Sequence, residues 1–362
     1  MKPTKTLYKV IEDKTITWFE NNNEYIVLEN TTADILKRLS KGISVKNIAK
    51  GLSKKLDVPL EKAEDFILNL QKKVFTNKNS DKNIIINDYR DIKKPTTYKF
   101  VKYYKINNII FKVSYLSETE LSLIHPKFGH LVVEEIAEFD NEFDIFIDNN
   151  FIFLYVNKKH IGSWSNIDVH YFQGKFSMEL IQKIHQKEEN EWLGVFHASA
   201  ISNGEKSMLF LGDSGNGKST SLALLQANGF TCLADDFVPV DAKTQEVYSF
   251  PASISIKKNS LKTLIPIYPE LETSEEYNFT RLNKVVRYLK PNNLNFFAHL
   301  PCNDLIFIKY QKDSELSCKK ISILANAIET SFVSPIPIHY CLQAIVKNHE
   351  PKREAVKLSP CL

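Results

Sequence analysis

The spacing of apolar residues changes from that of strands to that of helices within the first 75 residues. Leu7 to Ile11, Thr15 to Phe19 and Glu24 to Leu28 alternate apolar and polar positions, which predicts three short strands. The spacing then becomes three to four residues, which predicts three helices. Their inward positions would be Ile35, Leu36, Leu39, Val45, Ile48, Ala49, Leu52, Ala63, Phe66, Ile67 and Leu70. Residues 1–75 are therefore expected to form a separate winged-helix-like unit.

The pattern after residue 75 predicts a linker and then a larger region that begins with β-structure. Residues 76–97 are polar and contain a Lys-Lys-Pro run, which indicates a linker. From Tyr98 to Trp164 apolar and polar residues alternate in short runs, which predicts a mainly antiparallel β region. We expect residues 98–190 to form a β-rich lobe that precedes a domain over residues 191–362.

A glycine-rich segment between a strand and a helix, Gly212 to Ser219, carries the clearest chemical signal and is called the phosphate loop below. Ser207 to Leu211 predicts the strand, and Thr220 to Ala227 predicts the helix. The segment fits the pattern G-x-x-x-x-G-K-[ST], in which backbone N–H groups and a helix N-terminus bind a polyphosphate. Its nucleotide-binding residues would be Gly212, Asp213, Ser214, Gly215, Asn216, Gly217, Lys218, Ser219 and Thr220. We expect ATP or another nucleoside triphosphate here, and a surface turn without a ligand is the alternative.

Two adjacent carboxylates follow this loop after one helix and one short apolar segment. Asp235 and Asp236 lie 17 and 18 residues after Lys218. The short spacing predicts adjacent parallel strands, with both acids at the sheet edge where the phosphates would lie. One carboxylate can hold a metal ion, and the other can accept a proton from an attacking hydroxyl. The alternative is an Asp-Asp turn that begins the next element and does no chemistry.

His197-Ala198-Ser199, the phosphate loop and Ala234-Asp235-Asp236 together resemble the core of the HPr kinase/phosphorylase family. They are more distantly similar to ATP-dependent phosphoenolpyruvate carboxykinase. The resemblance covers about residues 191–260 and implies an α/β fold with a P-loop kinase core. It implies that His197 lies in the active site and that Asp236 accepts the proton. It also implies that Lys218 and Ser219 bind phosphate and Mg²⁺, which leaves Asp235 as a second metal ligand.

Two features of that family are missing from this sequence. Residues 249–254 contain no acid where the family carries a metal-binding glutamate. The arginine that contacts phosphate in the family has no clear match, and the candidates are Arg281, Lys284 and Arg287. The resemblance therefore predicts a kinase, without implying phosphorylase activity or HPr as the substrate.

Residues 25–36, with Lys41-Gly42, Val45 and Ile48-Ala49, resemble PqqD-like domains. Members of that family bind the leader of a ribosomally made peptide. The resemblance implies that the leader adds a strand beside the third strand, which an edge strand allows, and packs on the third helix. The peptide-binding residues would be Tyr25, Ile26, Val27, Leu28 and Phe66. A structural or dimerising module and a DNA-binding module are the alternatives.

Composition narrows the choice of partners and compartment. Apolar and charged fractions of 43% and 25% are typical of a soluble globular protein, and a net charge of +4 is too small to indicate a nucleic-acid partner. The five cysteines are scattered without metal-ligand spacing. The first residues lack an apolar signal core, and no apolar run reaches membrane-spanning length. We therefore expect a cytoplasmic protein with no membrane partner, and a homo-oligomer is left open.

Two classes of function fit these observations. The first is an ATP-dependent kinase that phosphorylates a serine or threonine hydroxyl of a precursor peptide, which the N-terminal unit recruits through its leader. The second is an ATP-gated regulator that binds a peptide or partner without phosphoryl transfer. A kinase of a small metabolite or of an HPr-like protein is a further alternative. The sequence identifies neither the peptide nor the phosphorylated residue.

Overall fold

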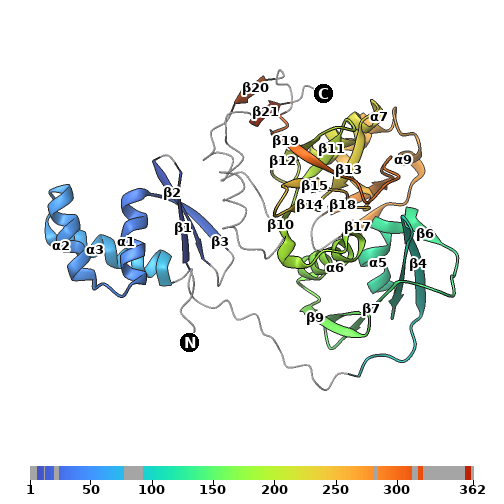
Figure 1. Cartoon of the computed structure of the whole chain (residues 1–362), viewed down its shortest axis with the longest axis horizontal. Helices are drawn as coiled ribbons and strands as arrows, with labels where there is room; N and C mark the ends of the chain where they lie inside the picture. Colours follow the sequence, from blue (N-terminus) through green and yellow to red (C-terminus); the bar gives the residue numbers. More distant parts are fainter. Residues whose placement is uncertain are drawn as a thin grey trace. The chain divides into compact units, whose positions relative to one another are not determined.

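The chain forms two compact units in this computed structural model (Figure 1), which describes residues 6–11, 13–19, 24–76, 93–279, 284–311, 317–320 and 355–359. The first unit contains residues 6–76, and the second begins at Lys93. Most of the expected linker, residues 77–92, lies outside the described residues. The chain combines helices with several sheets and is an α/β protein, as expected. Within the described ranges, no helix is both long enough and apolar enough to cross a lipid bilayer.

The first unit contains three strands and three helices at the positions that the apolar spacing predicts. Its elements are β1 (Thr6–Ile11), β2 (Lys14–Phe19), β3 (Glu24–Glu29), α1 (Asn30–Ser40), α2 (Val45–Leu56), α3 (Leu60–Leu70) and a π-helical turn η1 (Gln71–Thr76). The strands form an antiparallel sheet in the order β1-β2-β3, so β3 lies at an edge of the described sheet. The Ser44 hydroxyl accepts a hydrogen bond from the Asn47 N–H (3.4 Å), which caps the start of α2.

The core of the first unit is built from one face of each helix and from the sheet. Its buried members are Phe19, Ile35, Leu36, Leu39, Ile48, Ala49, Leu52, Ala63, Ile67 and Leu70. Phe66 was expected to face this core, but it is 48% exposed. Successive residues of a helix point about 100° apart, so a buried face centred on Ile67 leaves Phe66 at its margin. The inward prediction for Phe66 is therefore wrong, and its ring is open to a partner.

The second unit begins with a six-stranded sheet and two α-helices. These elements are β4 (Phe100–Ile106), β5 (Ile109–Tyr115), α5 (Glu118–Phe128), the 3₁₀ turn η2 (Gly129–Leu131), β6 (Val132–Val133), β7 (Asn141–Asp148), β8 (Phe151–Val156), β9 (Lys159–Ser165) and α6 (Val169–His185). The strand order is β6-β4-β5-β7-β8-β9. Only the β5–β7 pair of this sheet is parallel, because α5 lies in the connection between these two strands. The alternating pattern did not predict α5, although Ser117 and Glu120 form a capping box at its start.

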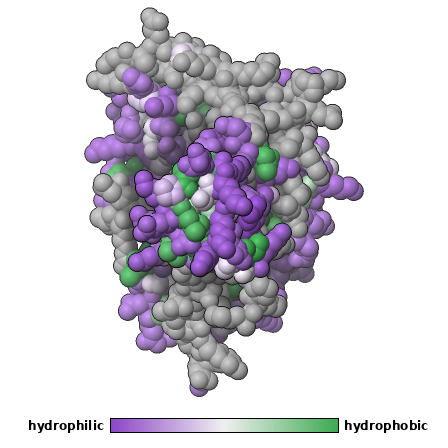
Figure 2. All heavy atoms as spheres, turned by 90° about the vertical axis from the view of Figure 1, so that its left-hand side faces the viewer, coloured by the Kyte–Doolittle hydropathy of each residue, from purple (hydrophilic) through white to green (hydrophobic). Residues whose placement is uncertain are grey.

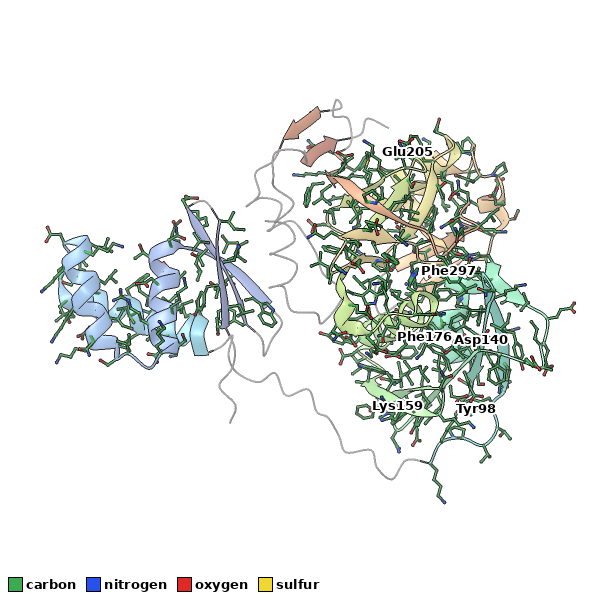
Figure 3. All side chains as sticks on the ribbon, in the orientation of Figure 1. Tyr98, Asp140, Lys159, Phe176, Glu205 and Phe297 are labelled. Carbon is green, nitrogen blue, oxygen red and sulfur yellow. The ribbon has the colours of Figure 1, made fainter. Side chains whose placement is uncertain are left out.

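Aromatic packing joins this sheet to the rest of the second unit. Phe176 on α6 (Figure 3) has its ring centre 5.2 Å from that of Phe143 on β7 and 6.0 Å from that of Phe128 at the end of α5. The Phe128 ring also lies 5.9 Å from Phe250, which precedes β16. All four rings are buried. Residues 98–190 and the region of the phosphate loop therefore share one core.

The phosphate loop belongs to a sheet of nine strands among the described residues. They are β10 (Trp192–Phe196), β11 (Ser199–Ser202), β12 (Ser207–Leu211), β13 (Thr231–Asp235), β14 (Val238–Asp241), β15 (Glu246–Tyr248), β19 (His299–Ile308), β20 (Ser317–Lys320) and β21 (Ala355–Ser359), and the 3₁₀ turn η3 (Glu189–Glu191) precedes β10. The main order is β10-β14-β15-β19-β12-β11-β13, and β21 pairs with β19 and β20. β12 and β13 were expected to be neighbours, but β11 lies between them, antiparallel to both. The two strands still run in the same direction, so both end at the same edge.

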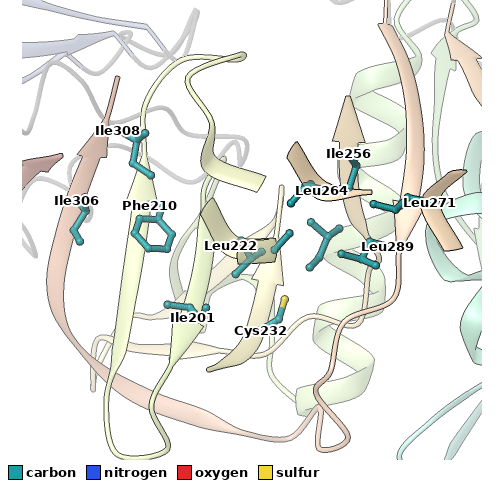
Figure 4. Close-up of a cluster of buried hydrophobic side chains, with 12 residues drawn as sticks. Ile201, Phe210, Leu222, Cys232, Ile256, Leu264, Leu271, Leu289, Ile306 and Ile308 are labelled. Carbon is teal, nitrogen blue, oxygen red and sulfur yellow. The ribbon is translucent and has the colours of Figure 1, made fainter. Parts of the chain in front are cut away.

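A buried apolar cluster fixes the helix that follows the loop, α7 (Lys218–Ala227). The cluster joins the large sheet to a three-stranded sheet and three short helical turns. These are β16 (Ile254–Lys257), η4 (Lys258–Ser260), α8 (Leu261–Leu264), α9 (Glu270–Thr273), β17 (Tyr277–Phe279) and β18 (Lys284–Leu289), with the strand order β16-β18-β17. Figure 4 shows Leu222 of α7 between Phe210 of the large sheet and Leu289 of the small sheet. This packing holds α7 against the large sheet, and the Ser219 hydroxyl at the start of α7 lies 2.9 Å from Asp235 Oδ2 at the end of β13.

We predict that Gly212→Ala destabilises the second unit, whereas Gly174→Ala does not. Gly212 has φ 134°, and a Cβ there would lie 2.6 Å from the Ile308 carbonyl oxygen. Strain of this kind costs on the order of 1–3 kcal/mol, so the unfolding temperature should fall by several degrees in calorimetry. Gly174 lies inside α6 with nothing within 4 Å of its Cβ position. Alanine there should be neutral or add about 0.5–1 kcal/mol. Equal unfolding temperatures for the two variants would contradict this account of the loop.

Candidate active site

The phosphate loop turns from β12 into α7 through three glycines with left-handed φ angles. Gly212, Gly215 and Gly217 have φ of 134°, 97° and 92°, which residues with a side chain rarely adopt. The Asn216 N–H donates to the Asp213 carbonyl oxygen (3.2 Å) and closes the turn. Because α7 begins directly afterwards, the N–H groups of its first turn lack partners within the helix. A loop of this form suits an anion.

The Lys218 side chain lies inside this loop. Its ammonium donates to the carbonyl oxygens of Gly212 (2.6 Å) and Asp213 (3.3 Å), and the residue is 7% exposed. Burial lowers the pKa of Lys218, and the charges of Asp235 and Asp236 oppose that shift. An anion in the loop would offer the ammonium a charged acceptor in place of two neutral carbonyls, which is the stronger interaction.

The Asp235 carboxylate is buried and surrounded by hydrogen-bond donors. The Ser199 hydroxyl donates to Oδ1 (2.6 Å), the Ser255 N–H donates to Oδ2 (3.0 Å), and the Ser219 hydroxyl lies 2.9 Å from Oδ2. Burial raises the pKa of Asp235, and the charge of Asp236 acts in the same direction, while these hydrogen bonds oppose the shift. The network places the Ser219 hydroxyl, at the start of α7, directly beside a carboxylate.

The Ser219–Asp235 pair fits a magnesium ion that arrives with a nucleotide. Hydroxyl and carboxylate oxygens are hard ligands of the kind that Mg²⁺ prefers. The described residues contain no group of three or more His, Cys, Asp or Glu side chains that could hold a metal ion. Mg²⁺ is usually bound through one or two carboxylates together with substrate phosphates, so two protein oxygens are enough.

Asp236 occupies a strained turn immediately after β13. Its φ is 70°, and the Phe237 N–H donates to the Asp235 carbonyl oxygen (2.8 Å), which closes a three-residue turn around Asp236. The Asp236 N–H donates to the Ala198 carbonyl oxygen (2.9 Å) on the neighbouring segment. Such backbone conformations cost on the order of 1–3 kcal/mol and persist where the surroundings hold them. The turn aims the second carboxylate away from Ser219 and toward different partners.

Both oxygens of Asp236 contact cationic or hydrogen-bonding side chains. His197 Nδ1 lies 2.8 Å from Oδ1, and Lys127 Nζ lies 3.1 Å from Oδ2. Burial alone would raise the pKa of Asp236. Lys127 and His197, with a smaller contribution from Lys284, reverse this and hold the pKa well below its ordinary value. Asp236 is therefore ionised, and its side chain is 24% exposed.

Most of the residues expected to form the site line one pocket. The loop and α7 contribute Ser214, Gly215, Gly217, Lys218, Ser219 and Thr220, and other elements contribute His197, Asp235, Asp236 and Lys284. The pocket encloses about 580 Å³ of space, part of it open to solvent. Three other loop residues, Gly212, Asp213 and Asn216, are not among the described residues that line this pocket.

The three candidates for a phosphate-contacting cation separate in the structure. Lys284, at the start of β18, lines the pocket, and burial lowers its pKa, with the charges of Lys127 and Lys257 adding to the shift. Arg287 instead donates to the carbonyl oxygens of Leu271 (2.6 Å) and Glu272 (2.7 Å). It therefore fastens α9 to β18, away from the pocket. Arg281 lies outside the described residues.

Two lysines of the site were not expected from the sequence. Lys257, at the end of β16, lines the pocket and donates to the Ser214 hydroxyl (2.7 Å). Lys127 comes from α5 and precedes its partner Asp236 by 109 residues. No local motif marks either lysine, because their positions depend on how distant elements pack. For Lys127 the readable signal was the capping box at Ser117, which would have predicted its helix.

The first unit holds the residues expected to bind a peptide. β3 pairs with β2 on one side, with Ile26 opposite Thr17 and Leu28 opposite Thr15. Ile26 and Leu28 pack against the core of the unit. Val27 points to the other face because side chains alternate along a strand. The Tyr25 side chain lies outside the described part of the structure, and its backbone belongs to β3. Any strand added here would therefore contact the backbone of β3 first.

We predict that Lys284→Met weakens nucleotide binding and that Arg287→Met does not. Lys284 faces the pocket, and one charge-assisted hydrogen bond contributes about 1.5–3 kcal/mol, which corresponds to roughly tenfold or more in the ATP dissociation constant. Arg287→Met should leave that constant unchanged and lower the unfolding temperature, because two carbonyls lose their donor. Isothermal titration calorimetry with ATP and Mg²⁺ measures both variants. A stronger loss of ATP binding in Arg287→Met than in Lys284→Met would contradict the assignment of the phosphate contact to Lys284.

Comparison with other proteins identifies no relative of this chain. No protein-family model matches the chain, and a search of curated proteins finds no match either. The function is therefore inferred from the residues that meet in the pocket and at the edge of β3.

Proposed function

We propose that this chain is an ATP-dependent kinase that phosphorylates a serine or threonine hydroxyl of a ribosomally made precursor peptide. One observation carries the proposal: Lys218 of the phosphate loop and two carboxylates with different partners, Asp235 and Asp236, line the same pocket. Phosphoryl transfer requires mainly that the protein position the reactants and neutralise charge. The pocket offers both a cradle for phosphates and a group that can receive a proton.

The different partners of the two carboxylates support different roles. Asp235 accepts a hydrogen bond from the Ser219 hydroxyl and is suited to hold Mg²⁺ together with that hydroxyl. Asp236 instead contacts His197 and Lys127, one at each carboxylate oxygen. An ionised carboxylate has about four lone-pair sites, so Asp236 can accept a hydroxyl proton while both contacts persist. His197 also lines the pocket and would keep this carboxylate turned toward the acceptor.

In the proposed reaction, the acceptor oxygen forms a bond to the γ-phosphorus of ATP. The bond from that phosphorus to the β–γ bridging oxygen breaks, ADP leaves, and Asp236 accepts the hydroxyl proton. Lys218 binds the phosphate oxygens, and Lys284 adds a second positive charge. When bound, Mg²⁺ would neutralise charge on the β- and γ-phosphates. A carboxylate with a low pKa is a weak base, which suits a loose transition state in which the hydroxyl keeps its proton until late.

The first unit supports a peptide as the acceptor. β3 is an edge strand of the described sheet, and an edge strand can pair with an added strand. Figure 2, viewed toward this unit, shows small apolar patches among hydrophilic side chains. Phe66 on α3 is one of the exposed apolar residues of the unit. A backbone edge and isolated apolar side chains fit an extended peptide.

Recruitment through a leader would also explain why the pocket is lined mainly by polar residues. A tethered peptide has its hydroxyl delivered at high effective concentration, without tight contacts to the residues around that hydroxyl. The walls of the pocket are formed mainly by serine, threonine, lysine, glycine and aspartate residues. Selectivity would then come from the leader, and the pocket would recognise only phosphate, metal and a hydroxyl.

We predict that Asp236→Asn abolishes transfer while ATP still binds. An amide cannot take the hydroxyl proton at neutral pH, so kcat should fall by roughly 10²–10⁴-fold. Asp235→Asn is the matched variant, and it should instead raise the Mg²⁺ concentration needed for half-maximal rate, because a metal ligand loses its charge. Steady-state labelling of precursor peptide with ATP measures both effects. Full kcat in Asp236→Asn would place the base elsewhere, with His197 the next candidate. ATP turnover by the wild type without any labelled peptide would favour the ATP-gated regulator.

We predict that Phe66→Ala raises KM for a precursor peptide with its leader by about tenfold and leaves kcat unchanged, as expected when one apolar contact of an interface is lost. Leu68→Ala is the control, since Leu68 has similar exposure (50% against 48%) on the same helix. Its side chain points about 200° away around the helix, so KM should stay at the wild-type value. Neither variant should change the kinetics of a leaderless peptide. Equal KM values for the two variants would refute leader binding by the side of α3 that carries Phe66.

A further inference from the structure

We propose that Lys127 is a positioning residue of the catalytic pocket. From outside the pocket lining, its ammonium holds the Asp236 carboxylate in place. Residues 98–190 would then supply part of the active site rather than only a scaffold beside it. The inference rests on the role proposed for Asp236, which is to orient and deprotonate the attacking group.

The geometry separates Lys127 from the residues that would touch substrate. Its ammonium lies 3.1 Å from Asp236 Oδ2, opposite the His197 contact at Oδ1. Its side chain is 15% exposed and lies 5.3 Å from the centre of the Phe237 ring. Lys127 is not among the described residues that line the pocket, whereas Asp236 and His197 are. Lys127 would therefore act on the reaction through residues of the pocket, and its direct contact is with Asp236.

The end of α5 is anchored so that Lys127 has little freedom to move. The Ser253 N–H donates to the Lys127 carbonyl oxygen (2.8 Å). The Ser253 hydroxyl lies 2.8 Å from His130 Nδ1, just after α5. The Phe128 ring packs edge-on against Phe250 at 5.9 Å. Contacts at Lys127 and at the residues just after it thus hold the backbone that carries its side chain.

The charges around Asp236 show why its orientation needs this clamp. Lys127, His197, Lys284, Lys218 and Tyr288 face the carboxylate from four different elements or loops, since Lys284 and Tyr288 share β18, and the Asp235 carboxylate repels it. Without Lys127, Oδ2 would lose its direct cationic contact. The carboxylate would then be free to rotate toward Lys218 or Lys284, which line the pocket. Misplacement of a catalytic group by about 1 Å can lower a rate by roughly 10²-fold.

The test compares Lys127→Met, Lys127→Arg and a matched control, Lys187→Met, in the full chain. Lys187 likewise pairs with an aspartate, Asp241, and lies 5.6 Å from the rings of Trp192 and Tyr248. It therefore reproduces the chemistry of the Lys127 contact outside the pocket. The readouts are the unfolding temperature, the KM for ATP, and kcat for phosphate release and for labelling of a serine-containing precursor peptide.

We expect Lys127→Met to lower kcat by roughly 10²-fold with the KM for ATP unchanged. Lys127→Arg should keep at least a third of the wild-type kcat, and Lys187→Met should keep all of it. A folded Lys127→Met with wild-type kcat, or an equal loss in Lys187→Met, would overturn the inference. If Lys127→Met does not fold, Lys127→Arg decides. A kcat of at least a third of the wild-type value supports the inference, and loss of kcat in a folded Lys127→Arg overturns it.

The same experiment separates this inference from the proposed kinase activity. Phosphate release without peptide labelling by the wild type would refute the kinase, and the comparison of variants would then use phosphate release, in which Asp236 orients water. A wild-type chain that turns over no ATP would overturn both.

Discussion

The buried Asp235 carboxylate is the interaction on which the rest of the site depends. Ser199 on β11, Ser219 at the start of α7 and the Ser255 N–H on β16 all donate to it. One side chain thus ties β13 to three elements that are distant in the sequence. Burying an unpaired charge would cost several kcal/mol, and these donors offset that cost. Because two of these donors, Ser219 and Ser255, also line the pocket, satisfying this carboxylate brings the phosphate loop to the edge of β13.

This constraint explains why the neighbouring aspartate is in a strained turn. With Asp235 directed into the network, the chain must turn within one residue, and Asp236 takes a φ of 70° to do so. Its carboxylate is then separated from Ser219 and held by His197 and Lys127. Two identical side chains that are adjacent in the sequence have different environments, one buried among hydroxyl groups and one between a histidine and a lysine. This difference makes separate roles for the two carboxylates chemically reasonable.

The sequence predicted the parts of the site that are determined locally. The phosphate loop was readable because glycine at φ values near 90–135° has no substitute, and the strand and helix beside it follow from apolar spacing over a few residues. The position of β11 between β12 and β13 was not readable, because pairing between strands depends on the whole sheet. Arg287 and Lys284 are three residues apart on the same short strand. Only the packing of α9 shows that the first binds carbonyls and the second faces the pocket.

The balance of charge in the pocket supports an anionic ligand. Lys218, Lys257 and Lys284 line it, Lys127 lies directly behind it, and only two carboxylates line the same space. The pKa values of Lys218 and Lys284 are lowered chiefly by burial, which shows that these ammonium groups are held where water solvates them poorly. A polyphosphate would restore the lost solvation with charged acceptors. Mg²⁺ at Ser219 and Asp235 would limit the repulsion between that polyphosphate and the carboxylates. The lysines of the pocket would therefore gain charged acceptors from a bound nucleotide and its metal, which would stabilise the site.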